Sequence, residues 1–374
     1  MVGRIVAKST PTQPVLAVVV LLAAALLPLR LRADNESRDD STLMAFLSAR
    51  GSERFDADRP SGRPAHGAAI ADMLYTYSRG KLRLLAEGAV ATDDAEIDRL
   101  QVGWEPVPDT LVWLGKFHEP ASSWNFGHDH GHYLQTAIST PAIEKWADDA
   151  GVLPENITGV FFDSRRPMGS AAVQVSIAAG VAPNPVQTDH RTYWERPISN
   201  GSHQVGWSAR LALLPDYTGS NSIGLLGARY KLDADELVAQ GLLNGERDVN
   251  ETVYGTYIDG DWHPWSLHAA VYDVDLSLRG TETGRNESFV AGYVQLERRF
   301  ADRYTAYFRH EDSARTQEST YLHADQNHFT VRSSLAGVRW DFARHQAITV
   351  ETSRTTTFSN RFTKISLQWS AVVR

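Results

Sequence analysis

The sequence predicts an all-β fold, a transmembrane antiparallel β-barrel of about sixteen strands, from three observations. Apolar and polar residues alternate along sixteen segments of the chain. Short and long links alternate between these segments, and aromatic residues lie at the ends of the apolar rows. This combination is typical of outer-membrane barrels, which have short turns at one end, longer loops at the other, and aromatic girdles.

The composition excludes several classes of protein. The chain has 374 residues, of which 42% are hydrophobic and 10% aromatic, so it is not a disordered chain. It has no cysteine, which excludes thiolate zinc sites, iron–sulfur clusters and cysteine nucleophiles. Its formal net charge of −8 gives no basic surface for nucleic acid, and we expect no such partner.

The first residues have the layout of a secretory signal peptide. Arg4 and Lys8 form a basic start, and 15–27 contains only Val, Leu and Ala. Ala33 is a small residue at a suitable cleavage position. The alternative is an uncleaved anchor helix, but the apolar stretch is short for a span of about 20 residues. We therefore expect a signal peptide over 1–33 and a barrel over 34–374.

Strict alternation predicts each strand in turn, because neighbouring side chains of a strand point to opposite faces. Leu100 and Val102, for example, alternate with Gln101. The sixteen expected strands are 43–50, 68–78, 81–92, 97–105, 110–118, 157–164, 170–180, 204–214, 221–231, 251–259, 264–275, 288–300, 303–312, 328–342, 345–354 and 361–373. The one helix that the sequence predicts lies near 141–150, with Pro141 suited to a first turn and Gly151 to a stop.

The links between the strands differ in length in a regular way. Links at 79–80, 106–109 and 301–302 are short. The longer ones are 51–67, 119–156, 181–203, 232–250, 276–287 and 313–327, and 93–96 is a short exception among them. This asymmetry predicts short turns at one end of a barrel and long loops at the other.

A soluble β-sandwich is the main alternative, because its strands alternate as well. Domains of this length usually divide in two, yet no linker, repeat or composition shift divides 34–374. Aromatic placement also favours a barrel with a membrane girdle. The aromatic residues at the row ends are Trp104, Trp265, Phe300, Tyr304, Trp340, Phe342 and Trp369.

A sheet that spans the hydrocarbon of a membrane must close into a barrel. Each unpaired backbone N–H or C=O costs several kcal/mol in hydrocarbon, so a spanning sheet must close. The apolar rows then face lipid, and sixteen strands leave a water-filled lumen lined by the polar rows. The charged residues expected to face this lumen are Arg83, Arg99, Lys116, Arg210, Arg309, Arg339, Glu87, Glu105, Glu297, Glu311, Asp341 and Glu351.

Several local motifs carry a resemblance to a known family. They are Val-Gly-Trp-Glu-Pro at 102–106, Leu-Gly-Lys-Phe-His-Glu-Pro at 114–120 and Leu-Gln-Thr-Ala-Ile-Ser-Thr-Pro at 134–141. The sequence resembles bacterial outer-membrane porin-like proteins, general and phosphate-selective porins among them, most densely over 96–162. The resemblance implies a barrel, solute passage and insertion by the barrel-insertion machinery. It departs from the family at the last residues, where Trp369 precedes Arg374 and no terminal aromatic residue follows.

The link at 119–156 is the third long loop and the longest. In general porins this loop folds inward and narrows the lumen, so we expect it to set selectivity by analogy. The residues expected at this constriction are His118, Glu119, His128, Asp129, His130 and His132. Imidazoles on alternate residues beside a carboxylate suit zinc, nickel or copper, which would make His128, His130 and His132 metal ligands. The favoured interpretation is that these histidines hydrogen-bond and shape the loop.

The sequence as a whole favours a porin of the outer membrane. It would let small hydrophilic solutes or ions diffuse, without a cofactor or a reaction, in contact with outer-membrane lipid. The sequence leaves the oligomeric state open; general porins are commonly trimers, which offers a homotrimer by analogy alone. Two alternatives remain open: a metal-binding barrel that uses the histidine loop, and an outer-membrane lipid hydrolase with Ser and His on its outer strands.

Overall fold

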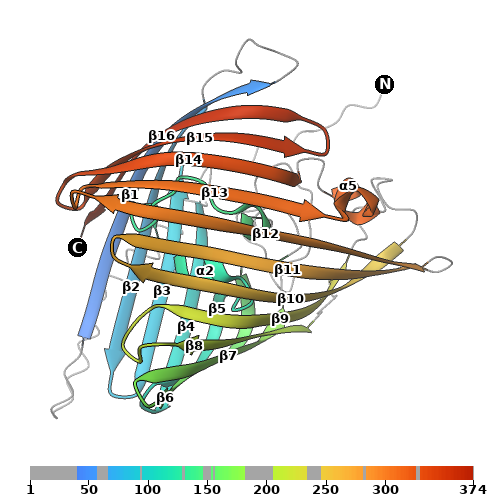
Figure 1. The fold of residues 1–374 in the computed structure, drawn as a ribbon. Helices are drawn as coiled ribbons and strands as arrows, with labels where there is room; N and C mark the ends of the chain where they lie inside the picture. Colours follow the sequence, from blue (N-terminus) through green and yellow to red (C-terminus); the bar gives the residue numbers. More distant parts are fainter. Residues whose placement is uncertain are drawn as a thin grey trace, which may run out of the picture.

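The computed structural model describes residues 40–56, 66–92, 95–128, 131–145, 153–154, 156–181, 205–233, 246–280, 284–325 and 329–373. These residues form sixteen antiparallel strands joined in one closed barrel (Figure 1). Each strand pairs with its neighbours in the sequence, and the first pairs with the last. The expected signal peptide, 1–33, lies outside the described residues.

All sixteen expected strands are present. Their bounds are β1 Asp40–Asp56, β2 His66–Arg79, β3 Leu82–Ala91, β4 Ala95–Val107, β5 Thr110–His118, β6 Asn156–Met168, β7 Ala171–Val181, β8 Val205–Leu214, β9 Ser222–Asp233, β10 Glu246–Trp262, β11 Trp265–Gly280, β12 Gly284–Phe300, β13 Tyr304–Ala314, β14 Thr330–Ala343, β15 Gln346–Thr357 and β16 Arg361–Val373. The prediction of an antiparallel barrel of about sixteen strands is therefore confirmed.

Short helices lie only in the links of the part of the chain that the structure describes. They are α2 Ser123–His128, α3 Ala142–Lys145, the 3-10 helix η1 Thr316–Glu318 and α5 Thr320–Asp325. The helix expected near 141–150 begins where predicted, as α3, and its remaining positions 146–150 lie outside the described residues. Helix α2 is an addition that the sequence pattern did not indicate. Among the described residues, none of the helices has the length and apolarity needed to cross a membrane.

The barrel closes through β1 and β16. Ser48 lies opposite Ser370 and Leu47 opposite Ala371, and the other edge of β1 pairs along its length with β2. A strand that is paired on both sides leaves no row of open N–H and C=O groups. In hydrocarbon this is the condition for a spanning sheet.

The two ends of the barrel differ as the link lengths predict. Tight hairpins at 80–81, 108–109, 169–170 and 344–345 each contain one residue with positive φ, as such turns require. The prediction of a long link at 276–287 is wrong. The ladder there continues to Arg279 opposite Gly284, so the strands use most of these residues and only 281–283 connect them.

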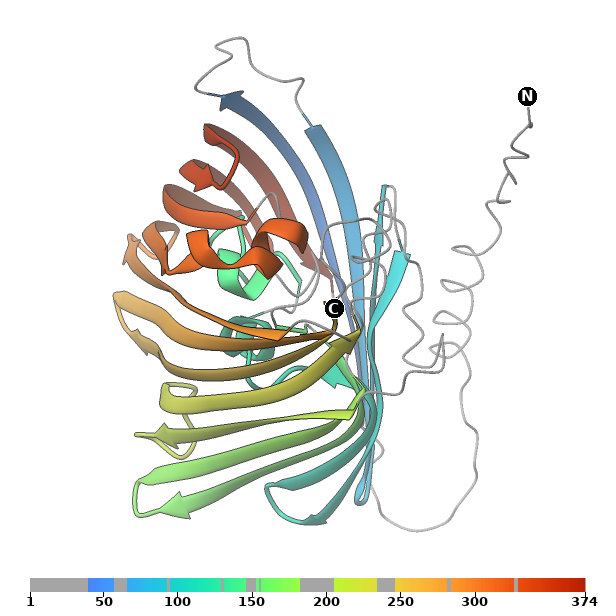
Figure 2. The same ribbon diagram turned by 90° about the vertical axis from the view of Figure 1, so that its right-hand side faces the viewer.

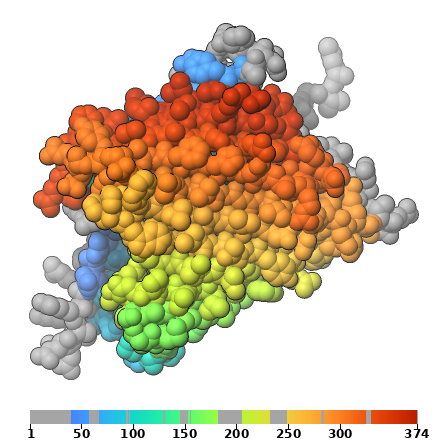
Figure 3. All heavy atoms as spheres, in the orientation of Figure 1, coloured from blue at the N-terminus to red at the C-terminus, as the bar shows by residue number. Residues whose placement is uncertain are grey.

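The outer surface of the barrel is apolar. Leu114 is 60% exposed and Leu100 is 52% exposed, whereas Gln101 on the inner face is buried. Figure 3 shows this outer surface as successive colour bands, because neighbouring strands follow one another in the chain. Exposed aromatic residues lie beside the short turns, namely Trp104, Trp262, Trp265, Phe300, Tyr304 and Trp340.

The interior is filled in part by the link between β5 and β6, residues 119–155, which we call L3. Figures 1 and 2 show the described parts of L3, in green, inside the barrel wall. Its side chains Ala121, Trp124 and Ile143 belong to the same buried cluster as Tyr272 of β11 and Phe161 of β6. The core of this protein therefore lies between L3 and the inner face of the sheet.

Candidate functional site

The first half of L3 lies against β11 and β12. The backbone N–H of Ser123 donates to Oη of Tyr272 at 3.1 Å, and the Ser123 hydroxyl lies 3.2 Å from Oη of Tyr293. Trp124 is buried and meets the ring of Tyr293 edge to face, with 6.1 Å between ring centroids. These contacts fix α2 on the barrel wall.

Glu144 joins the two helices of L3 to the same wall. Its carboxylate accepts hydrogen bonds from Ser122, from Ser123 at 3.1 Å and from Oη of Tyr272 at 2.5 Å. Asn125 of α2 also donates to the backbone carbonyl of Glu144, at 3.2 Å. Burial raises the pKa of the Glu144 carboxyl above its ordinary value.

Glu119 fixes the point at which L3 leaves β5. It is fully buried, and it accepts a hydrogen bond of 2.5 Å from Oη of Tyr230 on β9 and one of 3.2 Å from the N–H of Ala121. Desolvation dominates and raises the pKa of Glu119 to about 7, although hydrogen bonds from Tyr230 and Ser208 oppose it. The start of the loop is thus held by a group that titrates near neutral pH.

Two carboxylates on β13 and β15 hold the later part of L3. Glu351 accepts hydrogen bonds from the N–H of Ile138 at 3.0 Å and from Oη of Tyr307 at 2.9 Å. Its other oxygen accepts a bond from the hydroxyl of Ser139. Glu311 accepts a hydrogen bond of 2.7 Å from the backbone N–H of Ala142, at the start of α3.

Two arginines hold the backbone carbonyls of the same segment. Arg309 is fully buried; its guanidinium donates to the carbonyl of Thr140 at 3.1 Å and forms a 2.7 Å ion pair with Glu311. Arg339 donates to the carbonyls of Tyr133 at 2.6 Å and Gln135 at 2.7 Å. A guanidinium presents several donors in a fixed fork, which suits this bridging role.

L3 also reaches β1 and β2, on the far side of the lumen. Tyr133 packs with Phe46 and Leu74, and Nδ1 of His132 lies 3.7 Å from a carboxylate oxygen of Asp72. Gly131 has φ +71°, and a Cβ there would lie 2.3 Å from the ring of Phe46. The chain therefore passes close against this wall.

The opposite wall is contacted only three residues earlier. His128, at the end of α2, bonds to Asp259 of β10. In the strand order, five strands separate β11 from β1 and seven separate β10 from β2. The described parts of L3 thus contact two opposite arcs of the barrel.

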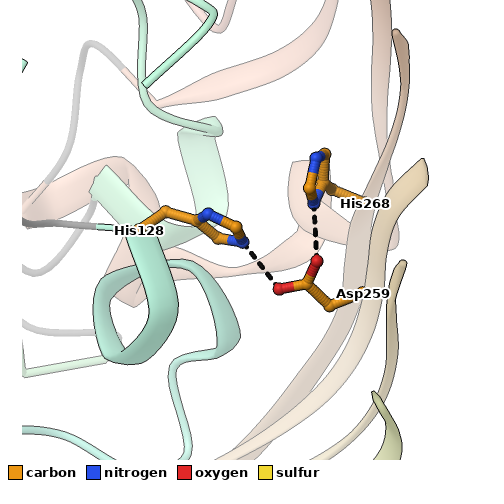
Figure 4. Close-up of side chains that lie close together, drawn as sticks. All are labelled: His128, Asp259 and His268. Carbon is orange, nitrogen blue, oxygen red and sulfur yellow. Dashed lines mark hydrogen bonds and ion pairs between the residues drawn. The ribbon is translucent and has the colours of Figure 1, made fainter. Parts of the chain in front are cut away.

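His128, Asp259 and His268 form a cluster where L3 meets β10 and β11 (Figure 4). Nε2 of His128 lies 2.7 Å from Oδ2 of Asp259, and Nδ1 of His268 lies 2.9 Å from Oδ1 of the same carboxylate. The side chains of His128 and Asp259 are 26% and 28% exposed. This cluster therefore remains open to the lumen.

The structure separates the histidines that the sequence groups together. His128 contacts β10 and β11, whereas His132 lies beside β2. Asp129 and His130 lie outside the described residues. His118 is buried at the end of β5, with its Nε2 3.8 Å from an oxygen of Glu87.

Asp259 and His268 were not among the residues singled out from the sequence, although a signal was present. Both follow the alternating pattern of their strands, and they lie directly opposite each other in the β10–β11 hairpin. Folding the expected strands 251–259 and 264–275 into a hairpin brings them together. The side chain of His128 could not be placed in the same way, because L3 has no periodic pattern.

Most of the expected lumen charges lie on the inner face in pairs. Arg99 and Glu87 form an ion pair of 2.5 Å across β3 and β4, and Arg83 pairs with Glu105 nearer the short turns. Arg210 lies over the ring of Phe126 in L3, 4.8 Å from its centroid. Other inner-face contacts are Arg339 with Asp341 at 2.8 Å and Glu297 with Gln295 at 2.7 Å.

The expectation that Lys116 faces the lumen is wrong. Lys116 lies opposite Leu100, whose side chain is on the exposed outer face, and directly opposite residues of a sheet share a face. Its neighbour Phe117 points inward and stacks on Phe161, with ring centroids 5.2 Å apart. The Lys116 ammonium instead donates to the carbonyl of Ile97 at 2.8 Å.

No protein-family model matches the chain, and no curated protein matches it. Solved structures of outer membrane proteins do match it. In-vitro folded OmpT of Vibrio cholerae is 11% identical with a TM-score of 0.57, and the match covers 92% of this chain and 99% of that protein. The outer membrane channel DcaP of Acinetobacter baumannii is 11% identical with a TM-score of 0.56, over 91% of this chain and 100% of that one. OmpF of Salmonella typhi, in complex with daunomycin, is 10% identical with a TM-score of 0.58, over 89% and 97%. The chain therefore has the porin-like barrel fold of these outer membrane proteins.

Proposed function

We propose that this protein is an outer-membrane porin, in which small hydrophilic solutes or ions diffuse passively through a lumen that L3 narrows. The observation that carries the proposal is the path of L3, which contacts β10 through His128 and β1 through Gly131. A closed barrel with an apolar outer face and a partly filled interior suits a pore with a constriction. One of the solved structures with this fold is described as an outer membrane channel.

The contacts of L3 favour a constriction of fixed width. Glu351, Glu311, Arg309 and Arg339 all bind backbone groups of L3, and Glu351 also binds the hydroxyl of Ser139. Contacts from these buried groups hold the loop in one place, because releasing any of them would cost a buried group one of its hydrogen bonds. The pore radius would therefore be set by the barrel wall and L3 together.

The charges at this constriction are of both signs. Arg309 pairs with Glu311, and Arg339 pairs with Asp341. Paired charges largely cancel one another at a distance, so we propose only weak selectivity between anions and cations. A salt gradient across the bilayer would then give a small reversal potential.

The cellular context is proposed from the same arguments. A signal peptide over 1–33 would direct export, and the barrel-insertion machinery would place the chain in outer-membrane lipid. A homotrimer is the proposed assembly; one of the solved structures with this fold is a trimer form of OmpT. No reaction is proposed.

Conductance of the refolded chain in planar lipid bilayers tests the function. We expect steady ohmic current steps, because the loop is bound firmly to the wall. A correctly folded barrel without conductance would contradict the porin proposal. Release of fatty acid from phospholipid by the same preparation would instead favour the lipid hydrolase.

A further inference from the structure

We propose that His128, Asp259 and His268 form a binding site for a divalent transition-metal ion such as Zn²⁺, and that the ion fastens L3 to the barrel wall. The site differs from the set His128, His130 and His132 that the sequence suggested, since two of its three ligands come from strands β10 and β11. It goes beyond the proposed pore, because a site of this kind would bind metal whether or not solutes pass.

The donor set matches the chemistry of such ions. Two imidazole nitrogens and one carboxylate are ligands that zinc, nickel and copper accept, whereas calcium and magnesium prefer oxygen alone. The potential ligand atoms of the three residues all lie within 4.8 Å of one another. The sequence alone suggested a metal in this loop, but the structure supplies a different set of partners.

The distances within the cluster fit an ion after small side-chain rotations. The two N···O separations are 2.7 and 2.9 Å. Ligands around one tetrahedral zinc lie about 3.3 Å apart when the bonds are about 2.0–2.1 Å long. Binding would replace the proton now shared between each imidazole and the carboxylate, since the metal takes neutral imidazole. The partly exposed side chains leave a fourth position for water.

The surroundings of His268 support a ligand role. Oε1 of Glu297 lies 3.6 Å from Nε2 of His268, the ring nitrogen that does not face Asp259. Gln295 donates to the same oxygen at 2.7 Å and so orients the carboxylate. A carboxylate behind a ligating imidazole fixes its tautomer and strengthens its bond to the metal.

The packing of His128 fixes the loop ligand. The ring of Trp124 lies 4.9 Å from that of His128 and 6.2 Å from that of His268, between centroids. Trp124 is itself buried against the wall. The indole thus limits the positions of both imidazoles, as a site with preorganised ligands requires.

Metal binding would act where L3 reaches into the lumen. His128 lies three positions before Gly131, which contacts the ring of Phe46 on β1. An ion held there adds positive charge and ties the end of α2 to β10 and β11. We therefore expect bound Zn²⁺ to lower single-channel conductance.

Calorimetric titration of Zn²⁺ into the refolded, detergent-solubilised chain tests the site. We expect one ion per chain, with affinity at least tenfold lower in His268→Gln and in Asp259→Asn, and roughly tenfold lower in Glu297→Gln. The matched control is His132→Gln, a loop histidine on the other wall, which should bind Zn²⁺ as the wild type does. Loss of binding in His132→Gln with retention in His268→Gln would overturn the assignment.

A second measurement does not depend on the folding of variants. X-ray absorption at the zinc edge of the wild-type chain should count two imidazole ligands and at least one oxygen. A shell of oxygen alone, or equal weak binding in all variants, would overturn the site. Calorimetry and conductance also separate the two proposals: an open pore without Zn²⁺ binding rejects the metal site, and Zn²⁺ binding without conductance rejects the pore.

Discussion

The carboxylate of Glu351 on β15 accepts the backbone N–H of Ile138 in L3 at 3.0 Å, so one strand of the wall holds the middle of the loop directly. The same carboxylate also accepts bonds from Ser139 and Tyr307. These partners lie far from it in the sequence, Ser139 by 212 positions. The position of this part of the loop therefore depends on contacts with strands that come much later in the chain.

Replacing Glu351 should release this part of L3. Glu351→Ala removes an acceptor of charged hydrogen bonds, each worth about 1.5–3 kcal/mol, and leaves buried donors without partners. We expect a larger and noisier single-channel conductance in planar bilayers, together with a lower unfolding midpoint. Glu53→Ala, at an exposed position of β1, is the matched control and should change neither. Unaltered current steps in Glu351→Ala would show that L3 does not limit the pore.

The pKa of Glu119 predicts a dependence of stability on pH. Burial raises this pKa to about 7, whereas the unfolded chain titrates near its ordinary value of about 4.3. Between these values the unfolded chain loses a proton that the folded chain keeps. The free energy of unfolding should therefore fall as pH rises from about 4.3 to 7, by at most roughly 4 kcal/mol, and level off above that.

Urea unfolding at several pH values between 5 and 8 measures this slope. Glu119→Gln is neutral throughout, so it should flatten the curve. Glu144 acts in the same direction because its pKa is also raised, and the Glu119→Gln/Glu144→Gln double variant should flatten the curve further. Glu318→Gln, at an exposed site, should keep the wild-type slope. An unchanged slope in the double variant would contradict the assignment.

The strands could be predicted because a membrane imposes a simple rule on them. The outer face must be apolar and the lumen face polar, so apolar and polar residues alternate along each strand. The rule fails where the inner face is apolar too. In β5, both Leu114 on the outer face and Trp113 on the inner face are apolar, so the alternation could not place Lys116.

The site could be predicted only in part, for a related reason. The location of L3 and its acidic and histidine residues follow from its length and place in the order of links. Its contacts do not, because they join the loop to strands far away in the sequence, such as β10, β13 and β15. Helix α2 has only six residues, too few to show a helical period.

Gly131 gives a test of the contact between L3 and β1. It has φ +71°, and an added Cβ would lie 2.3 Å from the ring of Phe46. Gly131→Ala should therefore lower stability by the backbone strain of roughly 1–2 kcal/mol and by the clash as well. Gly169→Ala is the matched control, because it has φ +69° but no atom within 4 Å of the added Cβ.

Urea unfolding of the two variants separates strain from clash. Gly131→Ala should be clearly less stable than Gly169→Ala. In a chain that already carries Phe46→Ala, which itself removes a buried ring, Gly131→Ala should cost less than it does in the wild type because the clashing ring is absent. Equal losses in both single variants would mean that L3 does not press against β1.

The outer face of the barrel gives the last prediction, which tests whether lipid surrounds it. Leu114 is 60% exposed in the middle of β5, and Leu134 is 55% exposed in L3. An arginine that faces hydrocarbon near the bilayer midplane costs about 2–4 kcal/mol, whereas one in a water-filled lumen costs little. Leu114→Arg should therefore make folding into lipid vesicles less favourable by about that amount, and Leu134→Arg should leave the free energy of folding nearly unchanged. Equal effects of the two substitutions would argue against a lipid-facing surface at β5, because only burial of one side chain in hydrocarbon distinguishes them.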